Sequence, residues 1–192
     1  MPRMTVNERP VEFDMEPDTP LLYALREAAN LTGTKSCGGG DCVGACMVLV
    51  DGAALRSCLI TIAEAEGRFI TTIEGLSRDR SHPVQQAMVA EQAIQCGYCT
   101  PGIVIAAAAL IQRNPAPSRR EIEAALPNVC RCGVYPRLVR AVQRAGRVVQ
   151  RQESISAAPA PGISAADAAE SVPALRVPEN DAGDPGETET TE

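Results

Sequence analysis

The chain has 192 residues, of which 45% are hydrophobic, and this length allows one or two packed domains. It has no tryptophan and only 3% aromatic residues, so its cores must be aliphatic and small. Residues 1–151 carry 15 acidic and 17 basic side chains, whereas residues 152–192 carry 9 acidic and 1 basic, so the net charge of -6 comes from the C-terminal segment. The sequence contains no apolar run long enough to span a membrane, which argues against a membrane-spanning role.

Eight cysteines restrict the chemistry further. They allow four disulfides, four metal ligands with spare thiols, or two complete four-thiolate sites. Disulfide frameworks are typical of secreted proteins, but the N-terminus shows neither an apolar signal segment nor a twin arginine. The close spacing of the thiols therefore favours metal sites, with iron–sulfur clusters ahead of zinc.

The chain begins with a pattern typical of a β-hairpin followed by a helix. Residues 4–14 alternate loosely between apolar and polar side chains, with a turn at 7–10. The tripeptide Asp18-Thr19-Pro20 predicts a helix start, with one of its first two residues as the N-cap. This is how a β-grasp ferredoxin begins, and we expect further strands at 47–51 and 69–73.

Four thiols lie among these predicted strands. A glycine-rich loop carries Cys37, Cys42 and Cys46, and Cys58 follows just past a predicted hairpin. Glycines supply the positive φ angles that such a loop needs, and the loop amides can point at sulfur. This arrangement resembles the plant-type ferredoxins, so we predict these four cysteines as ligands of a first 2Fe-2S cluster.

After a predicted linker at 76–81, the periodicity becomes helical. His82, the only histidine, precedes Pro83, which favours a capping or surface role over a catalytic one. We expect helices at 83–95, at 101–112, after the capping-box sequence Ser118-Arg-Arg-Glu121, and at 136–151.

A second set of thiols lies among these predicted helices. It is carried by the run Gln95-Cys-Gly-Tyr-Cys-Thr-Pro-Gly102 and by Cys130-Arg131-Cys132. Cys96 and Cys99 flank a glycine that permits a tight loop, and Cys130 and Cys132 point to the same side of an extended segment. Predicted helices begin after each half, one with Thr100 as its expected N-cap, and would aim their positive ends at the thiols. That field suits an anionic four-thiolate cluster.

These motifs resemble a known family. The run Gln-Cys-Gly-Tyr-Cys-Thr-Pro-Gly with a later Asn-x-Cys-Arg-Cys is similar to the iron–sulfur subunits of molybdenum hydroxylases, which include xanthine dehydrogenases, aldehyde oxidoreductases and nicotinate and isoquinoline dehydrogenases. The resemblance covers about residues 4–150. It implies an α+β fold, with a β-grasp, plant-type ferredoxin-like domain at 1–77 and an all-α four-helix-bundle 2Fe-2S domain at 78–151. Residues 152–192 are predicted to be a disordered acidic tail.

The resemblance also implies a role in electron transfer. Electrons from a molybdopterin cofactor on a large partner subunit would pass singly through two 2Fe-2S clusters to an acceptor, either a flavin subunit or a c-type cytochrome. The cluster of Cys96, Cys99, Cys130 and Cys132 would lie nearer the molybdenum, with Gln95 and Cys132 close to the pterin. The large subunit would oxidise an aldehyde or an N-heteroaromatic substrate, in the cytoplasm or, after co-export, in the periplasm.

The first loop departs from the family pattern. The usual spacing between its three thiols is x4 and then x2, whereas this chain reads Cys37-x4-Cys42-x3-Cys46. The length from Lys35 to Cys46 is unchanged, so one residue is shifted across the loop. We retain the predicted ligands because no other thiol is nearby. Pro127 also stands where the family usually has glycine.

Two other classes of protein use such thiols. A zinc-binding interaction module would hold the same four-thiolate sets structurally. A redox-sensing regulator would carry a cluster but act without a molybdenum partner.

An arginine stripe on the last predicted helix is expected to be solvated or to dock a partner subunit, because the chain lacks a recognised nucleic-acid fold. The stripe comprises Arg137, Arg140, Arg144, Arg147 and Arg151.

Overall fold

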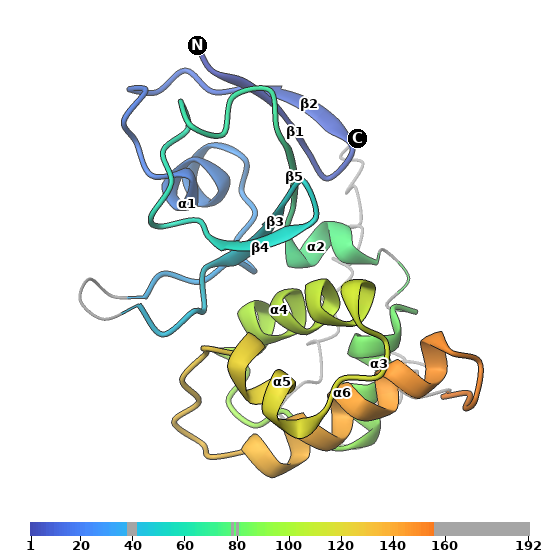
Figure 1. The fold of residues 1–192 in the computed structure, drawn as a ribbon. Coiled ribbons are helices and arrows are strands. Elements are labelled where there is room, and N and C mark those ends of the chain that lie inside the picture. Colours follow the sequence, from blue (N-terminus) through green and yellow to red (C-terminus); the bar gives the residue numbers. More distant parts are fainter. Residues whose placement is uncertain (38–41, 78, 80, 156–192) are drawn as a thin grey trace, which may run out of the picture. The chain divides into compact units, whose positions relative to one another are not determined.

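The computed structural model describes residues 1–37, 42–77, 79 and 81–155, which belong to one compact unit (Figure 1). The N-terminal half contains a sheet, and the C-terminal half is helical. The predicted mixed fold of strands and helices is therefore confirmed. Most of the predicted acidic tail, from residue 156 onward, lies outside the described residues.

The sheet has five strands in the order β2-β1-β5-β3-β4. Its strands are β1 (Arg3–Val6), β2 (Arg9–Glu12), β3 (Met47–Val50), β4 (Ala53–Arg56) and β5 (Phe69–Thr71). Strands β1 and β5 pair in parallel, and the other neighbours are antiparallel. Asn7 and Glu8 form the first hairpin turn at φ angles of 49° and 67°, the left-handed pair whose twist suits a two-residue hairpin.

One face of the sheet is covered by α1 (Leu21–Tyr23), which continues into the π-helical turn η1 (Ala24–Ala28). The predicted side-chain cap by Asp18 or Thr19 is wrong, because Pro20 occupies the N-cap position without a side-chain hydrogen bond. Backbone carbonyls from the loop after β4 satisfy the first helical amides instead. Ile60 accepts from the Leu21 amide at 2.9 Å and Ser57 from the Leu22 amide at 3.0 Å.

Strand β3 is buried on both faces. Val48 and Val50 belong to the core beneath α1, together with buried residues such as Phe13. Met47 and Leu49 point the other way and pack with Ile105, Ala106 and Ala109 of α4 (Thr100–Arg113). Burial of both faces explains why the strand reads as a continuous apolar run.

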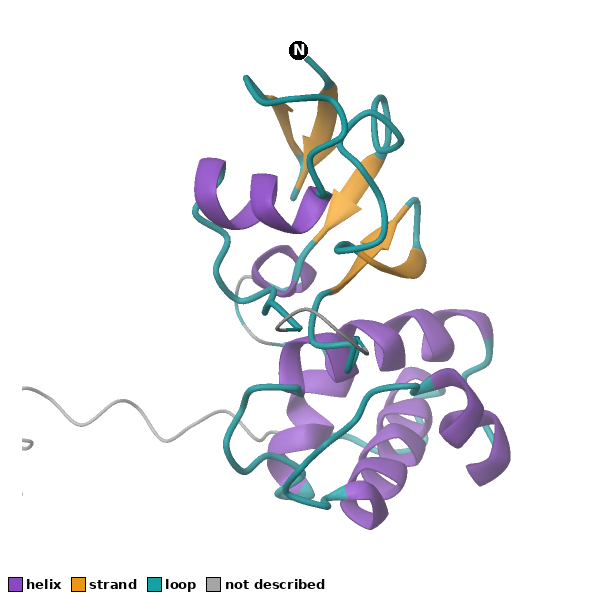
Figure 2. Cartoon of the chain, turned by 90° about the vertical axis from the view of Figure 1, so that its left-hand side faces the viewer, coloured by secondary structure: helices purple, strands orange, loops and turns teal. Residues whose placement is uncertain are grey.

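The helical half contains α2 (Ile73–Leu76), α3 (Pro83–Ala90), α4, α5 (Arg119–Ala125) and α6 (Tyr135–Val149). Helix α4 contacts β3 on one side and α3, α5 and α6 on the others, and Figure 2 shows it next to the sheet. Its residues 102–111 are all buried. The central position predicted for this apolar helix is therefore confirmed.

Two helix boundaries were predicted well and one was not. Ser118 and Glu121 form both bonds of the capping box, and the His82 side chain caps α3, as expected. Helix α3, however, ends at Ala90 rather than near Gln95. Gln92 takes a φ of 50°, and the Ala93 amide donates back to the Met88 carbonyl at 2.9 Å, which closes the helix.

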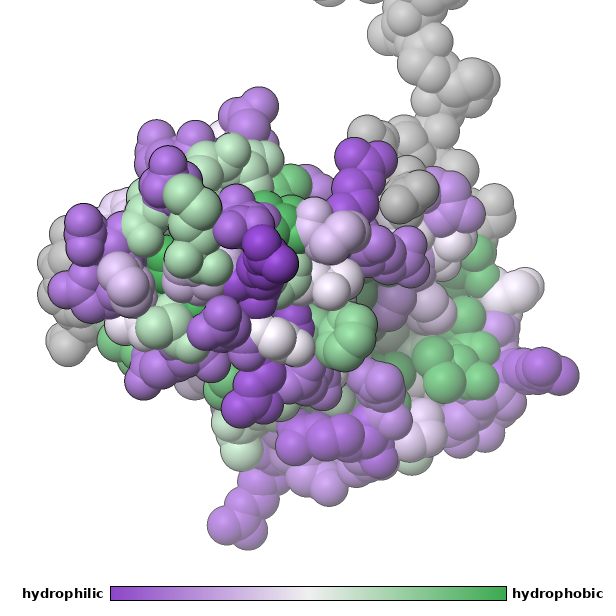
Figure 3. All heavy atoms as spheres, turned by 90° about the horizontal axis from the view of Figure 1, so that it is seen from above, coloured by the Kyte–Doolittle hydropathy of each residue, from purple (hydrophilic) through white to green (hydrophobic). Residues whose placement is uncertain are grey.

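The helices of the described residues include none with the length and apolar character needed to cross a membrane. In the view of Figure 3, hydrophobic side chains form separate patches among hydrophilic ones. Scattered patches of this kind are normal on a folded domain.

Candidate metal centres

The first predicted ligand set converges on one point. The sulfur atoms of Cys37, Cys42, Cys46 and Cys58 all lie within 4.8 Å of one another. Cys42 is 2.8 Å from Cys37, 3.3 Å from Cys46 and 3.5 Å from Cys58. The shifted residue in the loop therefore does not prevent convergence. The backbone path at residues 38–41 lies outside the described residues.

The sheet fixes two of these thiols. Cys46 immediately precedes β3 and Cys58 follows β4, and the antiparallel pair aligns Met47 with Arg56. Ser57 is fully buried and donates to the Cys46 carbonyl through both its amide, at 3.2 Å, and its hydroxyl, at 2.7 Å. Because Ser57 precedes Cys58, these bonds hold Cys46 and Cys58 close together. A lone serine in a loop carries no specific signal, so its role could not be predicted from the sequence.

The pKa directions show how the thiols respond to this environment. Burial raises the pKa of Cys46 and of Cys58 above the usual thiol value. Burial opposes ionisation of Cys42 as well, but hydrogen bonds from Cys37 and from the Gly44 amide outweigh it and lower its pKa. Metal ligands must be thiolates, so metal binding here must displace protons that burial otherwise retains.

The donor set fits a four-thiolate metal centre. Four sulfurs around one tetrahedral zinc would lie ~3.8 Å apart, given a Zn–S bond of ~2.3 Å. The closest pair, at 2.8 Å, must therefore spread to admit zinc, and must also adjust to admit a two-iron cluster.

The second predicted set is brought together in two pairs. The Cys99 thiol contacts that of Cys130, and the Cys96 thiol contacts that of Cys132. Cys99 and Cys130 are buried, Cys132 is half-buried and Cys96 is exposed. Gly97 has a φ of 82° with open space around it, so it is needed for its left-handed conformation rather than for close approach.

Local backbone geometry supports negative charge at this site. Cys99, rather than the predicted Thr100, occupies the N-cap position of α4, so a thiol lies at the positive end of a buried helix. Burial opposes ionisation of Cys130, but the nearby backbone amides of Val134, Cys132 and Gly133 and the Cys99 thiol lower its pKa. Burial and the neighbouring thiols raise the pKa of Cys99 to about 12.

Gln95 and Cys96 are exposed beside the buried members of the second set. On the other side, the Tyr98 hydroxyl donates to the Ser36 carbonyl, next to the first set. The two thiol sets are thus connected through the segment that carries the second motif, and its outer edge is open to solvent.

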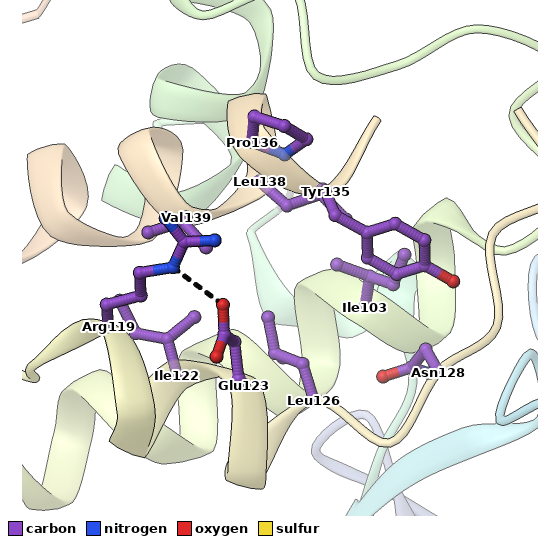
Figure 4. Close-up of a pocket in the computed structure, with 10 residues that line it drawn as sticks. All are labelled: Ile103, Arg119, Ile122, Glu123, Leu126, Asn128, Tyr135, Pro136, Leu138 and Val139. Atoms are coloured by element: carbon purple, nitrogen blue, oxygen red, sulfur yellow. Dashed lines mark hydrogen bonds and ion pairs between the residues drawn. The ribbon is translucent and has the colours of Figure 1, made fainter. Parts of the chain in front are cut away.

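A separate cavity of 330 Å³ lies between α4, α5 and α6 (Figure 4). Its lining is mainly apolar. The Arg119–Glu123 ion pair, at 2.7 Å, lies toward one end, and Tyr135 and Asn128 lie at the other. The Tyr135 hydroxyl accepts from the Cys130 amide at 2.7 Å, so this side chain supports the ligand loop. None of the predicted site residues lines the cavity.

Known proteins are similar to this chain over both of its halves. Residues 4–72 match the family model of the 2Fe-2S iron-sulfur cluster binding domain, and residues 72–143 match that of the 2Fe-2S binding domain. A nicotinate dehydrogenase subunit from Pseudomonas putida is 52% identical over 145 residues, which cover 74% of this chain and 92% of the relative. The chain belongs to the iron–sulfur subunits of the molybdenum hydroxylases.

Further relatives agree with this assignment. The alpha subunit of isoquinoline 1-oxidoreductase from Brevundimonas diminuta is 45% identical over 145 residues, which cover 74% of this chain and 95% of the relative. A solved chain of quinoline 2-oxidoreductase from Pseudomonas putida 86 superposes with a TM-score of 0.71 and 39% identity, over 79% of this chain and 96% of that chain. The resemblance inferred from the cysteine motifs is confirmed. The iron–sulfur subunit transfers electrons within an oxidoreductase and is not its catalytic part.

Proposed function

We propose that this subunit binds two 2Fe-2S clusters and relays electrons between them one at a time. The observation that carries the proposal is the convergence of the first four thiols on one point, together with the two thiol pairs of the second set, within one compact unit. The ligands of the first cluster are Cys37, Cys42, Cys46 and Cys58, and those of the second are Cys96, Cys99, Cys130 and Cys132.

Membership of the iron–sulfur family favours a redox role over a structural zinc site. A two-iron cluster bound at each set would supply one-electron chemistry, and the surroundings of its sulfurs would tune its potential. Backbone amides near Cys42 and Cys130 lower the pKa of these thiols and so favour the ionised ligand. Buried backbone around Cys46, Cys99 and Cys130 keeps water from these sulfurs. The protein would therefore orient the clusters, keep water away from them and tune their potentials.

Each site belongs to one half of the chain. We place the first cluster in residues 1–77 and the second in residues 78–151, where α3 to α6 would form a four-helix bundle. The two family models meet at residue 72, close to this boundary, which supports the division.

The exposed residues of the second site suggest where a partner subunit would bind. Gln95 and Cys96 are exposed at the second site, and Cys132 is half-buried, so this edge is the one available to a molybdopterin-binding large subunit. The first site would then deliver electrons to a flavin subunit or a c-type cytochrome. Relatives named for nicotinate and isoquinoline suggest that the partner oxidises an N-heteroaromatic substrate rather than an aldehyde.

Metal analysis and spectroscopy of the purified complex test the proposal. We expect about four iron atoms per chain, matching acid-labile sulfide, and two distinguishable paramagnetic signals after reduction. Cys58→Ser should alter one signal and Cys132→Ser the other, so each variant is the control for the other. A colourless protein containing zinc and no sulfide would instead establish a structural module. A cluster that is stable and functional without a large subunit would indicate a redox sensor.

A further inference from the structure

A single peptide group joins the two thiol sites. Val43 is bonded directly to Cys42, a predicted ligand of the first cluster. The Val43 carbonyl accepts from the Val129 amide at 3.0 Å. Val129 is bonded directly to Cys130, a predicted ligand of the second cluster. The Val43–Gly44 peptide thus forms a continuous route of covalent and hydrogen bonds between the two sites.

Asn128 holds the adjoining Gly44–Ala45 peptide in place. Its side-chain amide Nδ2 donates to the Gly44 carbonyl at 2.8 Å and lies 3.6 Å from the sulfur of Met47. Asn128 is only 4% exposed, so water does not compete for the bond. A buried amide with this geometry restrains the chain more strongly than an exposed one, because breaking the bond would leave a buried polar group unpaired.

Close packing around Gly44 and Asn128 leaves no room for an added side chain. Gly44 has a φ of 76°, and a Cβ there would lie 2.5 Å from Asn128 Nδ2. A Cβ on Gly102, in the first turn of α4, would lie 2.0 Å from the Gly44 carbonyl oxygen. A side chain at either position would therefore clash with its neighbours. At Gly44 the positive φ angle also favours glycine. Three segments that are distant in sequence meet at this one carbonyl.

We propose that Asn128 is a positioning residue for electron transfer, which fixes the Val43–Gly44 peptide as the bridge between the two cluster sites. The inference rests on the proposed function, because it requires a cluster at each site. The step moves one electron from one site to the other, and no bond forms or breaks. Electron tunnelling decays less steeply along covalent and hydrogen bonds than across a gap, so the bridge favours transfer.

The test compares Asn128→Leu with Met47→Leu in the complex with its large subunit. Leucine at 128 keeps the branch at Cγ and removes the bond to Gly44, and its methyl groups add volume. Leucine at 47 removes only the sulfur contact and is the matched control. We expect Asn128→Leu to retain iron and to weaken the spin coupling between the reduced clusters. Met47→Leu should match the parent in both measurements.

Unchanged spin coupling in an iron-replete Asn128→Leu protein would overturn the inference. If leucine prevents iron loading, Asn128→Ala and Asn128→Gln replace it. The alanine variant should then show weaker spin coupling than the parent and the glutamine variant a smaller loss, and spin coupling equal to the parent throughout this series would also overturn it. A parent protein without two paramagnetic signals would refute the proposed function itself, so the two failures are distinguishable.

Discussion

The carboxylate of Glu153 lies 2.6 Å from Nε of Arg144, and its other oxygen lies 3.0 Å from Nε of Arg147. Arg144 also pairs with Glu91 of the turn after α3, which in turn pairs with Arg140. The arginine stripe was expected to be solvated or to dock a partner, but these three arginines form ion pairs within the chain. The network fastens the segment that follows α6 onto that helix.

Neutralising Glu153 should destabilise the helical half. We expect Glu153→Gln to lower the melting temperature more than Glu123→Gln, which removes one exposed ion pair. Arg144 holds the pKa of Glu153 below its usual value. A carboxylate of this kind stabilises the fold above its unfolded pKa of about 4.5, and the effect disappears as the pH falls through the lower folded value. The difference between parent and variant in thermal scans should therefore vanish at strongly acidic pH. Equal melting temperatures at neutral pH would contradict the prediction.

His82 should make stability depend on pH near neutrality. Its Nδ1 accepts from the Val84 amide at 3.2 Å, and burial lowers its pKa below 6.5. As the pH falls, the unfolded chain binds a proton before the folded chain does, so stability should decrease from about pH 7 down to the folded pKa and then level off. His82→Asn keeps a capping oxygen and removes the titration. Denaturation at several pH values measures both proteins, and parallel profiles would refute the assignment.

Sequence reasoning succeeded where the signal is local. The capping box at Ser118 and the cap at His82 depend on neighbouring residues, and the structure contains both. The turn predicted at 7–10 is shorter than expected, because Arg9 already belongs to β2. The second set of thiols carried the family assignment because its spacing is specific, whereas the first loop departs from the family pattern. Local patterns of this type can be recognised in the sequence because they do not depend on contacts with distant segments.

Other features depend on segments far apart in the sequence. The N-cap predicted at Asp18 or Thr19 failed because carbonyls from the loop after β4 satisfy the helical amides. Burial of Met47 on the outer face of β3 requires α4, which comes much later in the chain. Asn128 was visible in its motif, but its bond to Gly44 spans 84 residues and has no sequence signature. These contacts arise only once both halves are packed.

The capping box makes a simple stability prediction. Ser118 Oγ accepts from the Glu121 amide at 3.3 Å, and the Glu121 carboxylate accepts from the Ser118 amide at 2.7 Å. Ser118→Ala should cost about 1 kcal/mol of unfolding free energy, because it leaves an amide at the helix start without its cap. Ser118→Asp restores the acceptor and should recover most of the loss. Urea denaturation measures all three proteins, and an alanine variant as stable as the parent would show that water caps α5 equally well.

Gly146→Ala should be destabilising although it lies in a helix. Alanine normally stabilises a helix interior by about 1 kcal/mol relative to glycine. Here a Cβ would lie 2.2 Å from the backbone carbonyl oxygen of Pro115, so α6 would have to shift away from the turn after α4. Such overpacking costs about 1 to 3 kcal/mol. Gln143→Ala on the same helix is the control and should stay within about 0.5 kcal/mol of the parent. A Gly146→Ala protein more stable than the parent would show that the turn at Pro115 can move to admit the Cβ atom.

Tyr98→Phe should weaken the retention of iron at the first site, although Tyr98 itself lies between Cys96 and Cys99 of the second site. The Tyr98 hydroxyl donates to the Ser36 carbonyl, and Ser36 directly precedes Cys37. Loss of one such bond costs about 0.5 to 1.5 kcal/mol, which is enough to loosen the approach to a ligand without unfolding the chain. We expect faster loss of iron to a chelator, seen as earlier decay of the signal that Cys58→Ser alters.

Tyr23→Phe is the matched control for this change. Tyr23 is 48% exposed and Tyr98 is 49% exposed, so both substitutions remove a hydroxyl from a half-exposed ring. Tyr23 lies at the end of α1, away from the ligand loops, so iron loss should proceed at the parent rate. If Tyr98→Phe also loses iron at the parent rate, the hydrogen bond to Ser36 does not restrain the ligand. If instead the signal that Cys132→Ser alters decays first, Tyr98 acts on its own loop.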